Sequence, residues 1–431
     1  MRLRHVVSCF LTHPADGTVL LGRRSEQVAT YKGCWAAISG SVEGEGLLEA
    51  ALREIAEETG LAAEQVEVIS EGRPIRFVDW PLATAWVVHP FLLRCRAPEA
   101  VRRDWEHVQL RWTAPSDIAG LRTVPKLAEA YESAARGDVA AEDVFARVAE
   151  DRTHGAEELG IWTLEGLRAA ALRETSAADW REAMTAACRR ALELRPSMAP
   201  VRSAALEAFR LCREEPQDAL SAGLAAAICH REEAPLAAAA TAATMLPDGA
   251  RVVTLSYSST VLCTLRDAAE HLGTVLVAES RPACEGRETA RLATSFGIPT
   301  ELLTDAATAG ALKDCDILLI GADAVCADGT VVNKTGTFAL TCAARRLGVQ
   351  TLCVATESKL LPAGHEPQVE EMPPEELGPP IPEVQTRNPY FEPIPPDLID
   401  ALIGPTGSLI LESLAERADA LSTLQEALKG A

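Results

Sequence analysis

The chain has 431 residues, of which 48% are hydrophobic, and its formal net charge at pH 7 is −21. This length exceeds what one ordinary hydrophobic core accommodates, so we expect two or three domains. The negative charge argues against nonspecific nucleic-acid binding, which needs a basic surface to meet the phosphates. We therefore expect no nucleic-acid partner, whereas small phosphorylated ligands are compatible with local arginines and lysines.

Membrane insertion and disulfide bonding are both unexpected from the sequence. No stretch approaches the roughly 20 uninterrupted apolar residues of a membrane helix, and the N-terminus lacks the small-residue cleavage site of a signal peptide. The twelve cysteines include no C-x-x-C pair, and several, such as Cys263 and Cys353, lie inside apolar runs. Small buried hydrophobes in a reducing compartment explain this pattern, so we expect a cytoplasmic protein without membrane contact.

Residues 1–138 are predicted to form a first domain with a mixed sheet. Short strand-like runs alternate with turn signals, and one amphipathic helix at Leu47–Thr59 interrupts them. A second helix is predicted at Lys126–Ala135, near the end of this domain. The predicted strands are His5–Leu11, Thr18–Leu21, Ala85–Leu93 and Val108–Trp112.

The predicted helix Leu47–Thr59 carries three glutamates at helical spacing. Glu54 is followed by Glu57 at i+3 and by Glu58 at i+4, so all three carboxylates lie on one face. Like charges so placed repel unless a cation lies between them, and hard divalent ions prefer carboxylate oxygens. A solvated acidic surface is the alternative when the helix is considered alone.

The residues that flank this helix favour metal binding. The string REIAEETGL begins at Arg53, and seven residues separate it from the loop GSVEGE, which ends at Glu45. Together they resemble the signature of the Nudix hydrolases, which matches in residue type and spacing from Glu45 through Leu61. The loop departs slightly, because the glycine expected six places before Glu45 is Ser39, and Gly40 comes one position late.

This resemblance implies an α/β/α domain that hydrolyses a nucleoside-diphosphate-type substrate with Mg²⁺ or Mn²⁺. It implies Glu54, Glu57 and Glu58 as metal ligands, with Glu45 nearby. It also implies Glu57, Glu54 and Arg53 as catalytic residues, with Arg53 orienting the carboxylates. The substrate is not implied, because specificity in this family lies in loops outside the signature.

Residues 154–247 are predicted to form a helical domain. A polar, charge-rich connector at 136–153 precedes it, and apolar residues then recur at three- and four-residue spacing with few glycines. Pro196 and Pro200 interrupt this pattern once. We expect a helical bundle with no chemistry of its own.

Residues 248–431 are predicted to form a Rossmann-like domain with a parallel sheet. Short runs of valine, isoleucine and leucine are each followed by a helix, which is typical of a doubly wound sheet. The predicted strands are Val252–Leu255, Val275–Ala278, Ile317–Ile320 and Thr351–Ala355, and the predicted helices are Val261–Leu272, Arg287–Phe296 and Thr337–Leu347.

Polar residues follow three of these strands, at the carboxyl ends where such sheets bind ligands. Hydroxyl, guanidinium, amide and ammonium groups at these positions suit a phosphorylated sugar. The serines alternatively cap a helix, and the arginines alternatively form surface ion pairs. The candidate residues are Ser256, Ser258, Ser259, Arg281, Arg287, Asp323, Asn333 and Lys334.

Three strings in this half resemble one family closely. ESRPACEGRETA begins at Glu279, GADAVCADGTVVNKTGT at Gly321 and NPYFEPIPPDLI at Asn388. The family unites the alpha, beta and delta subunits of eukaryotic translation initiation factor 2B with isomerases of methylthioribose-1-phosphate and ribose-1,5-bisphosphate. The resemblance covers roughly 154–424, and His154 stands where the family often has the arginine of Arg-Gly-Ala.

In this family, the isomerases use a thiol and a carboxylate to move a proton between the first two sugar carbons. The resemblance places the carboxylate at Asp323 and the thiol at Ser256. A hydroxyl is a far weaker acid than a thiol and does not readily replace it in proton transfer. The string that begins at Ser256 looks more like the non-catalytic factor subunits, which favours binding over isomerisation.

The expected fold class is α/β multidomain, with a Nudix mixed-sheet domain, a helical middle domain and a Rossmann-like domain. The leading function is a Mg²⁺-dependent Nudix hydrolase fused to a phosphosugar-binding domain. The alternatives are a sugar-phosphate isomerase with an accessory Nudix domain and Asp323 as acid/base, and a non-catalytic sensor or interaction protein. The second family pairs through its Rossmann-like domains, and apolar residues at 409–428 suit an interface, so we expect a homodimer.

Overall fold

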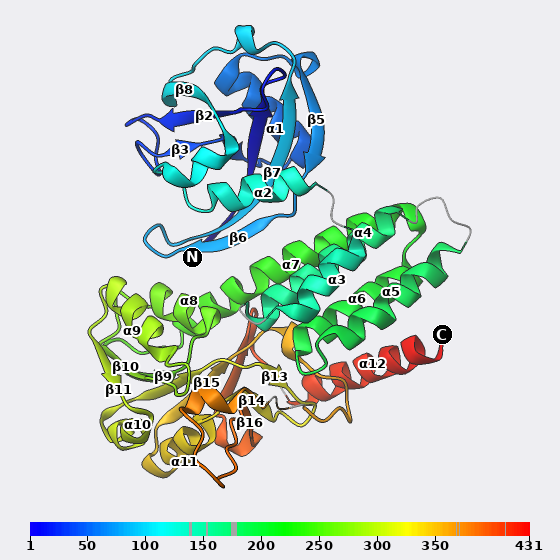
Figure 1. Cartoon of the computed structure of the whole chain (residues 1–431). Helices are drawn as coiled ribbons and strands as arrows, with labels where there is room; N and C mark the ends of the chain where they lie inside the picture. The colour runs from blue at the N-terminus through cyan, green and yellow to red at the C-terminus, as the bar shows by residue number, and fades with distance from the viewer. Residues whose placement is uncertain (138–139, 152–153, 174–178, 368, 370, 410) are drawn as a thin grey trace. The chain divides into compact units, whose positions relative to one another are not determined.

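The computed structural model describes residues 1–137, 140–151, 154–173, 179–367, 369, 371–409 and 411–431. The chain divides into two compact units, Arg2–Val139 and Ala140–Ala431 (Figure 1). The helical and Rossmann-like regions, predicted as separate domains, fall in the same unit. The predicted boundary at 138 and the end of the predicted connector at 152–153 lie outside the described residues.

The N-terminal unit is built on the predicted mixed sheet. At its centre, β1 (Arg2–Thr12) pairs in parallel with β7 (Thr84–Cys95) and antiparallel with β2 (Val19–Arg24) and β4 (Ile38–Ser41). The further strands are β3 (Trp35–Ala36), β5 (Val66–Glu71), β6 (Ile75–Asp79) and β8 (His107–Thr113).

Helices cover both faces of this sheet. Cys9 of β1 packs in one core cluster with α1 (Leu47–Thr59), and Phe10 packs in another with α2 (Leu127–Arg136). Successive side chains of a strand point to opposite faces, so neighbouring residues of β1 enter different cores. The unit therefore has the α/β/α layers expected from the sequence.

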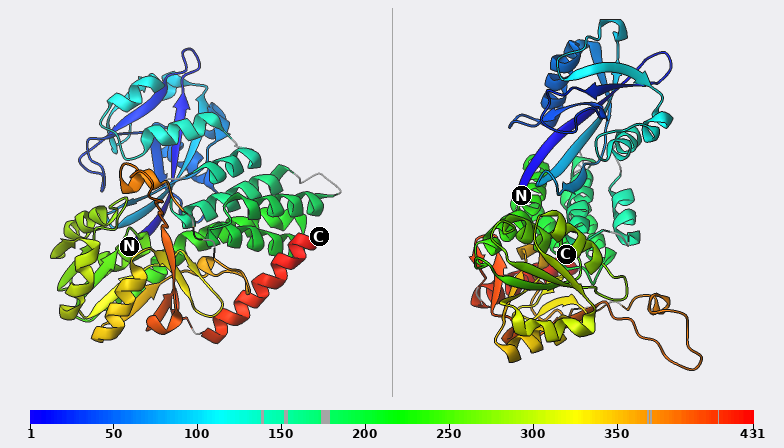
Figure 2. Two further views of the ribbon diagram at one scale, coloured as in Figure 1. Left: turned by 60° about the horizontal axis from the view of Figure 1, so that its bottom comes forward. Right: turned by 90° about the vertical axis from the view of Figure 1, so that its left-hand side faces the viewer.

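Helices α3–α7 and the C-terminal helix form the bundle of the second unit. Phe145 and Val148 of α3 are buried, and α3 packs against α4, although this stretch was predicted as a polar connector. Leu428 of the C-terminal helix α12 joins the same core, and α12 runs beside α5 and α6 (Figure 2). The helices are α3 (Ala141–Glu150), α4 (Ala156–Arg173), α5 (Trp180–Leu194), α6 (Ala199–Glu214), α7 (Gln217–Ala243) and α12 (Leu411–Gly430).

The second sheet has the order β11-β10-β9-β12-β15-β17-β18, and all of its pairs are parallel except β17 with β18. The chain leaves β9 in one direction to build β10 and β11, and then crosses back to place β12 on the other side of β9. Ligands bind open α/β sheets at such a switch point. The strands are β9 (Arg251–Leu255), β10 (Thr274–Ala278), β11 (Thr300–Leu303), β12 (Ile317–Ile320), β15 (Gln350–Val354), β17 (Ala401–Gly404) and β18 (Gly407–Ser408).

A small antiparallel sheet and four further helices complete the second unit. In the small sheet, the central strand β14 pairs with β13 and β16. In the described part of the chain, no helix is long and apolar enough to cross a membrane. The elements are β13 (Ala324–Val325), β14 (Val331–Lys334), β16 (Phe391–Ile394), α8 (Ser259–Asp267), α9 (Gly286–Ser295), α10 (Asp305–Ala311) and α11 (Thr337–Leu347).

Candidate functional site

In the N-terminal unit, Arg53 of α1 connects three of the predicted carboxylates. Its Nη2 lies 2.7 Å from Glu45 Oε1, and its Nη1 lies 2.6 Å from Glu54 Oε1 and 3.7 Å from Glu57 Oε2. Nη2 also donates to the backbone oxygen of Ser41 at 2.8 Å. One guanidinium thus fixes the loop that carries Glu45 against the acidic helix, as the orienting role predicted for Arg53 requires.

The two buried glutamates of α1 lie against strand β4. Glu54 is 8% exposed and Glu58 is 3% exposed. A β-carbon at Gly40 would lie 1.9 Å from the carboxylate carbon of Glu54, so only glycine leaves room for this side chain. The backbone N–H of Ser39 donates to Glu58 Oε1 at 3.4 Å. The late glycine of the loop therefore serves the acidic helix directly.

The electrostatics of this cluster favour a bound cation. Burial raises the pKa of Glu54, and burial together with nearby Glu106 and Glu54 raises the pKa of Glu58 to about 9. Glu58 Oε2 is buried and accepts no hydrogen bond from the residues that the structure describes. A divalent ion that takes carboxylate oxygens would relieve both effects, so the donor chemistry fits Mg²⁺ or Mn²⁺.

The carboxylates of this cluster do not by themselves form a metal-binding arrangement in the described part of the chain. Among the described residues, no group of three or more histidine, cysteine, aspartate or glutamate side chains is arranged to hold a metal ion. Glu57 has 61% of its side chain exposed, whereas Glu54 and Glu58 point into the domain. The three glutamates share the helix face that the sequence predicted but differ in depth.

A buried histidine lies behind the acidic helix and was missed by the sequence analysis. His107 is 1% exposed, and its Nδ1 lies 3.0 Å from Asp104 Oδ1. Its Nε2 lies 3.7 Å from Glu58 Oε2. The ring packs so closely on Gly22 that a β-carbon there would lie 2.1 Å from it. Asp104 and Gly22 thus fix the edge of the ring that faces Glu58.

A cavity of about 590 Å³ opens beside the acidic helix, which is within the usual range of about 300–1,000 Å³ for ligand sites. Arg53, Glu54, Glu57 and Glu106 line it. The lining also includes aromatic and basic side chains, namely Tyr31, Phe77, Trp86, Trp105, Arg4, Arg24 and Lys126.

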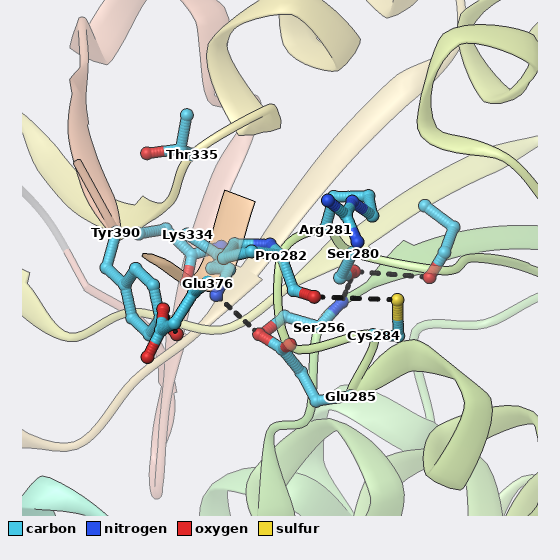
Figure 3. Close-up of polar contacts among 12 residues, drawn as sticks. Ser256, Ser280, Arg281, Pro282, Cys284, Glu285, Lys334, Thr335, Glu376 and Tyr390 are labelled. Atoms are coloured by element: carbon cyan, nitrogen blue, oxygen red, sulfur yellow. Dashed lines mark hydrogen bonds and ion pairs between the residues drawn. The ribbon is translucent and has the colours of Figure 1, made fainter. Parts of the chain in front are cut away.

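In the second unit, a chain of polar contacts joins Ser256, Glu285 and Lys334 (Figure 3). Ser256 Oγ donates to Glu285 Oε1 at 3.1 Å, and Lys334 Nζ lies 2.6 Å from the same oxygen. Ser256 follows β9, Glu285 precedes α9, and Lys334 ends β14. Three segments therefore converge near the switch point, through a glutamate that was not among the predicted site residues.

Lys334 is held on its other side by Tyr390. The lysine side chain is 4% exposed, and its Nζ lies 3.9 Å from the centroid of the Tyr390 ring. The Tyr390 hydroxyl donates to Glu376, which also accepts from Asn388 at 3.0 Å. A buried ammonium between a carboxylate and an aromatic face is well compensated.

The serines after β9 and the arginines after β10 have mostly structural contacts. Ser258 accepts from the backbone N–H of Val261 at 3.4 Å and is the N-cap of α8, the alternative noted for these serines. Ser259 is exposed in the first turn of that helix. Arg287, with 63% of its side chain exposed, pairs with Glu279 at 3.3 Å.

Arg281 and Ser280 lie in the turn after β10. The backbone N–H groups of both residues donate to the carboxylate of Asp305, at 2.8 and 2.7 Å, and the Arg281 side chain is exposed. Ser280 Oγ accepts from the backbone N–H of Ser256 at 2.6 Å. This turn thus supports Ser256, while the Arg281 side chain projects from it.

Asp323 lies between β12 and β13, and its backbone N–H donates to the backbone oxygen of Val332 on β14 at 2.8 Å. It borders a cavity of about 140 Å³ that is also lined by His154, Gly155 and Val332. Burial raises the pKa of Asp323, although Lys359 and Lys334 act in the opposite direction. Val332 and Lys334 are two residues apart on β14, so their side chains project from the same face of that strand.

Asn333 is buried at 7% exposure, and its Nδ2 donates to Thr337 Oγ1 at 3.2 Å. Its side chain therefore fixes the start of α11, whereas Val332 and Lys334 project from the other face of β14. Of the predicted set, the structure brings Ser256, Asp323 and Lys334 into one region.

Comparisons with known proteins agree with both halves of this description. A model of the NUDIX domain matches residues 2–134, and a model of the initiation factor 2 subunit family matches residues 152–410. The chain therefore combines an N-terminal NUDIX domain with a unit of the initiation factor 2 subunit type. It belongs to the initiation factor 2 subunit family.

Two curated relatives are isomerases by name. The chain is 35% identical over 187 residues to ribose 1,5-bisphosphate isomerase of Haloferax volcanii, a match that spans 40% of this chain and 56% of that protein. It is 31% identical over 285 residues to methylthioribose-1-phosphate isomerase of Alkalilimnicola ehrlichii, spanning 59% of this chain and 81% of that protein. The first match thus covers little more than half of the relative.

Solved structures show the same fold for the second unit. The translation initiation factor eIF-2B of Pyrococcus horikoshii OT3 matches with a TM-score of 0.53 and 27% identity, covering 63% of this chain and 96% of that one. The 5-methylthioribose 1-phosphate isomerase from the same organism matches with a TM-score of 0.51 and 23% identity, covering 68% and 88%. The second likeness supports the fold alone.

Proposed function

We propose that the N-terminal domain hydrolyses the diphosphate bond of a nucleoside-diphosphate-type substrate with Mg²⁺ or Mn²⁺. The observation that carries this proposal is the guanidinium of Arg53, which links Glu45 and Glu54 beside a cavity of about 590 Å³. The aromatic side chains of the cavity offer faces for a nucleobase, and its basic side chains offer charge for phosphate oxygens.

In this proposal, Glu54, Glu57 and Glu58 would hold the metal, with Glu45 nearby. The ion would stabilise charge that develops on the phosphate oxygens during attack by water. Arg53 would hold the carboxylates of Glu45 and Glu54 in fixed positions relative to each other. Glu57 is the most accessible of the carboxylates and borders the cavity, which suits it to accept a proton from the attacking water.

The test is a hydrolysis screen of nucleoside-diphosphate-linked compounds with Mg²⁺ and Mn²⁺. Glu57→Gln removes the charge of a cavity carboxylate and should lower turnover by about 100-fold or more. Glu49→Gln is the matched control, because Glu49 is an exposed glutamate in the first turn of the same helix. If the wild type cleaves no diphosphate, or if both variants lose activity equally, the proposal fails.

For the C-terminal unit, we propose that a phosphorylated sugar binds at Lys334 and Asp323. The buried ammonium of Lys334 beside the strand ends supports this proposal, together with the isomerase names of the two relatives. Calorimetry with ribose 1,5-bisphosphate and methylthioribose-1-phosphate tests it. If neither compound binds, a non-catalytic interaction protein would be the better description of this unit.

We also propose a homodimer, although helix α12 supports it less than the sequence analysis expected. Apolar residues of α12, among them Leu414 and Leu428, are buried within the same chain. The remaining support is the resemblance to a family that pairs through its Rossmann-like domains. Sedimentation over a range of protein concentrations tests this, and a monomer mass throughout would refute it.

A further inference from the structure

An isomerisation of an aldose phosphate to a ketose phosphate makes two demands on a site. A base must take a proton from C2 of the sugar and return it to C1, and a donor must stabilise the oxygen that gains electron density meanwhile. Ser256 can donate a hydrogen bond but does not meet the first demand, because an alkyl hydroxyl is a poor proton carrier near neutral pH. A different side chain in this region must supply the base if the site is catalytic.

Glu285 has the geometry for that role. One of its oxygens, Oε1, is held by Ser256 Oγ at 3.1 Å and by Lys334 Nζ at 2.6 Å. The other, Oε2, is buried and makes no hydrogen bond to the residues that the structure describes. The carboxylate is thus fixed through one oxygen, and its second oxygen has no competing hydrogen-bond partner among the described residues.

The surroundings of Glu285 supply the remaining groups. The Lys334 side chain is 4% exposed and lies over the Tyr390 ring, so solvent screens its charge only weakly. Asp323 lies near enough to Lys334 to interact with it, and burial favours the protonated form of that carboxyl by raising its pKa. An acid, a base and a cation therefore lie around the same strand ends.

We infer that Glu285 is the general base for aldose–ketose isomerisation at the C-terminal site, positioned by Ser256 and assisted by Lys334. This inference rests on the proposed binding of a phosphorylated sugar there. The ring opens as its oxygen takes a proton from Asp323 and the bond from C1 to the ring oxygen breaks. Glu285 then takes the C2 proton, and the electron pair of that bond forms the C1–C2 double bond.

The second half of the reaction restores every group. The C2 hydroxyl returns a proton to Asp323 as the C2 carbonyl forms, and C1 takes the proton from Glu285. Lys334 stabilises the negative charge that develops on the C2 oxygen. No oxidant, reductant or co-reactant is needed, because each proton comes from the enzyme or the substrate and returns.

The test follows isomerisation of ribose 1,5-bisphosphate and methylthioribose-1-phosphate by NMR in deuterated water, with the full-length protein. Glu285→Gln should lower turnover by about 100-fold or more. The affinity of this variant for the substrate, measured by calorimetry, should stay the same or rise, because Lys334 no longer pairs with Glu285 and can pair with the phosphate. Glu285→Asp should retain part of the turnover. Glu288→Gln is the matched control, since Glu288 is an exposed glutamate in the first turn of α9, the helix that Glu285 precedes, and it pairs with Arg291.

The outcomes separate the inference from the proposed binding. Deuterium should enter the product at C1 with the wild type and much more slowly with Glu285→Gln. If the wild type binds either compound but does not isomerise it, the inference is overturned and the binding function stands. Full activity of Glu285→Gln also overturns it. If neither compound binds, the binding proposal itself fails. Thermal melts of each variant verify that the second unit is folded.

Discussion

Replacing Lys334 with alanine is the most direct perturbation of the C-terminal site. The change removes an ammonium that is 4% exposed and lies 2.6 Å from Glu285 Oε1. A charge-assisted hydrogen bond to an anionic ligand contributes about 1.5–3 kcal/mol, which corresponds to an affinity loss of about 10- to 150-fold. The uncompensated Glu285 carboxylate would add repulsion, so the upper part of that range is expected.

Arg287→Ala provides the comparison for this prediction. Arg287 also follows β10, but 63% of its side chain is exposed and it pairs with Glu279 at 3.3 Å. Exposed ion pairs contribute about 0–1 kcal/mol, so this variant should change affinity by less than about fivefold. Lys334→Met keeps the apolar stem of the lysine and should lose as much affinity as Lys334→Ala if charge is responsible.

Calorimetry with ribose 1,5-bisphosphate measures both variants against the wild type. The reasoning is refuted if Lys334→Ala binds as well as the wild type, or if Arg287→Ala loses as much affinity. Circular dichroism and a thermal melt check that Lys334→Ala is folded. If that variant fails to fold, Lys334→Met supplies the same comparison with less loss of packing.

Two further predictions concern the N-terminal helix and the acid stability of the second unit. Gly40→Ala would place a β-carbon 1.9 Å from the Glu54 carboxylate. Displacing that carboxylate by about 1 Å should lower the rate of diphosphate hydrolysis by about 100-fold. Unchanged kinetics would contradict the close approach of Gly40 and Glu54. Burial lowers the pKa of His365 to about 4, with Arg202 and Lys429 contributing. In the unfolded chain His365 binds a proton below pH 6.5, whereas in the folded chain it does so only near pH 4. The free energy of unfolding should therefore decrease as the pH is lowered from 6.5 to 4. Urea unfolding at pH 7 and pH 5 should show a smaller decrease for His365→Gln than for the wild type.

The strongest local signals in the sequence predicted their elements well. Helix α1 has the predicted bounds, Leu47–Thr59, because it ends at Gly60, whose φ of 73° only glycine adopts readily. The connector predicted at 136–153 contains the boundary between the two units, but most of it is helix α3. In α3, Val144, Phe145 and Val148 form an apolar stripe on an otherwise polar helix, and that spacing was a readable helix signal.

The candidate sites depended on contacts that span long stretches of sequence. Arg53 and Glu45 were predictable because a short motif places them eight residues apart. Glu285 and Lys334 are 49 residues apart in the sequence, and only the tertiary fold of the second unit brings them to 2.6 Å. The negative charge of Glu285 also differs from the cationic groups that a phosphate site was expected to have.

Each of the two sites places a cation beside at least one carboxylate, and the residue that carries the positive charge differs for a physical reason. Arg53 serves Ser41, Glu45 and Glu54 at once, with three donor contacts between 2.6 and 2.8 Å. Such divergent acceptors need the planar, multidentate fork of a guanidinium, whose charge persists at any physiological pH.

Lys334 has one carboxylate and one aromatic face to satisfy, and an ammonium does so as a point charge with donors left over. Those remaining donors are what a phosphate or an enolate oxygen would use. Arg53 is therefore suited to hold a fixed framework, and Lys334 is suited to exchange one anionic partner for another.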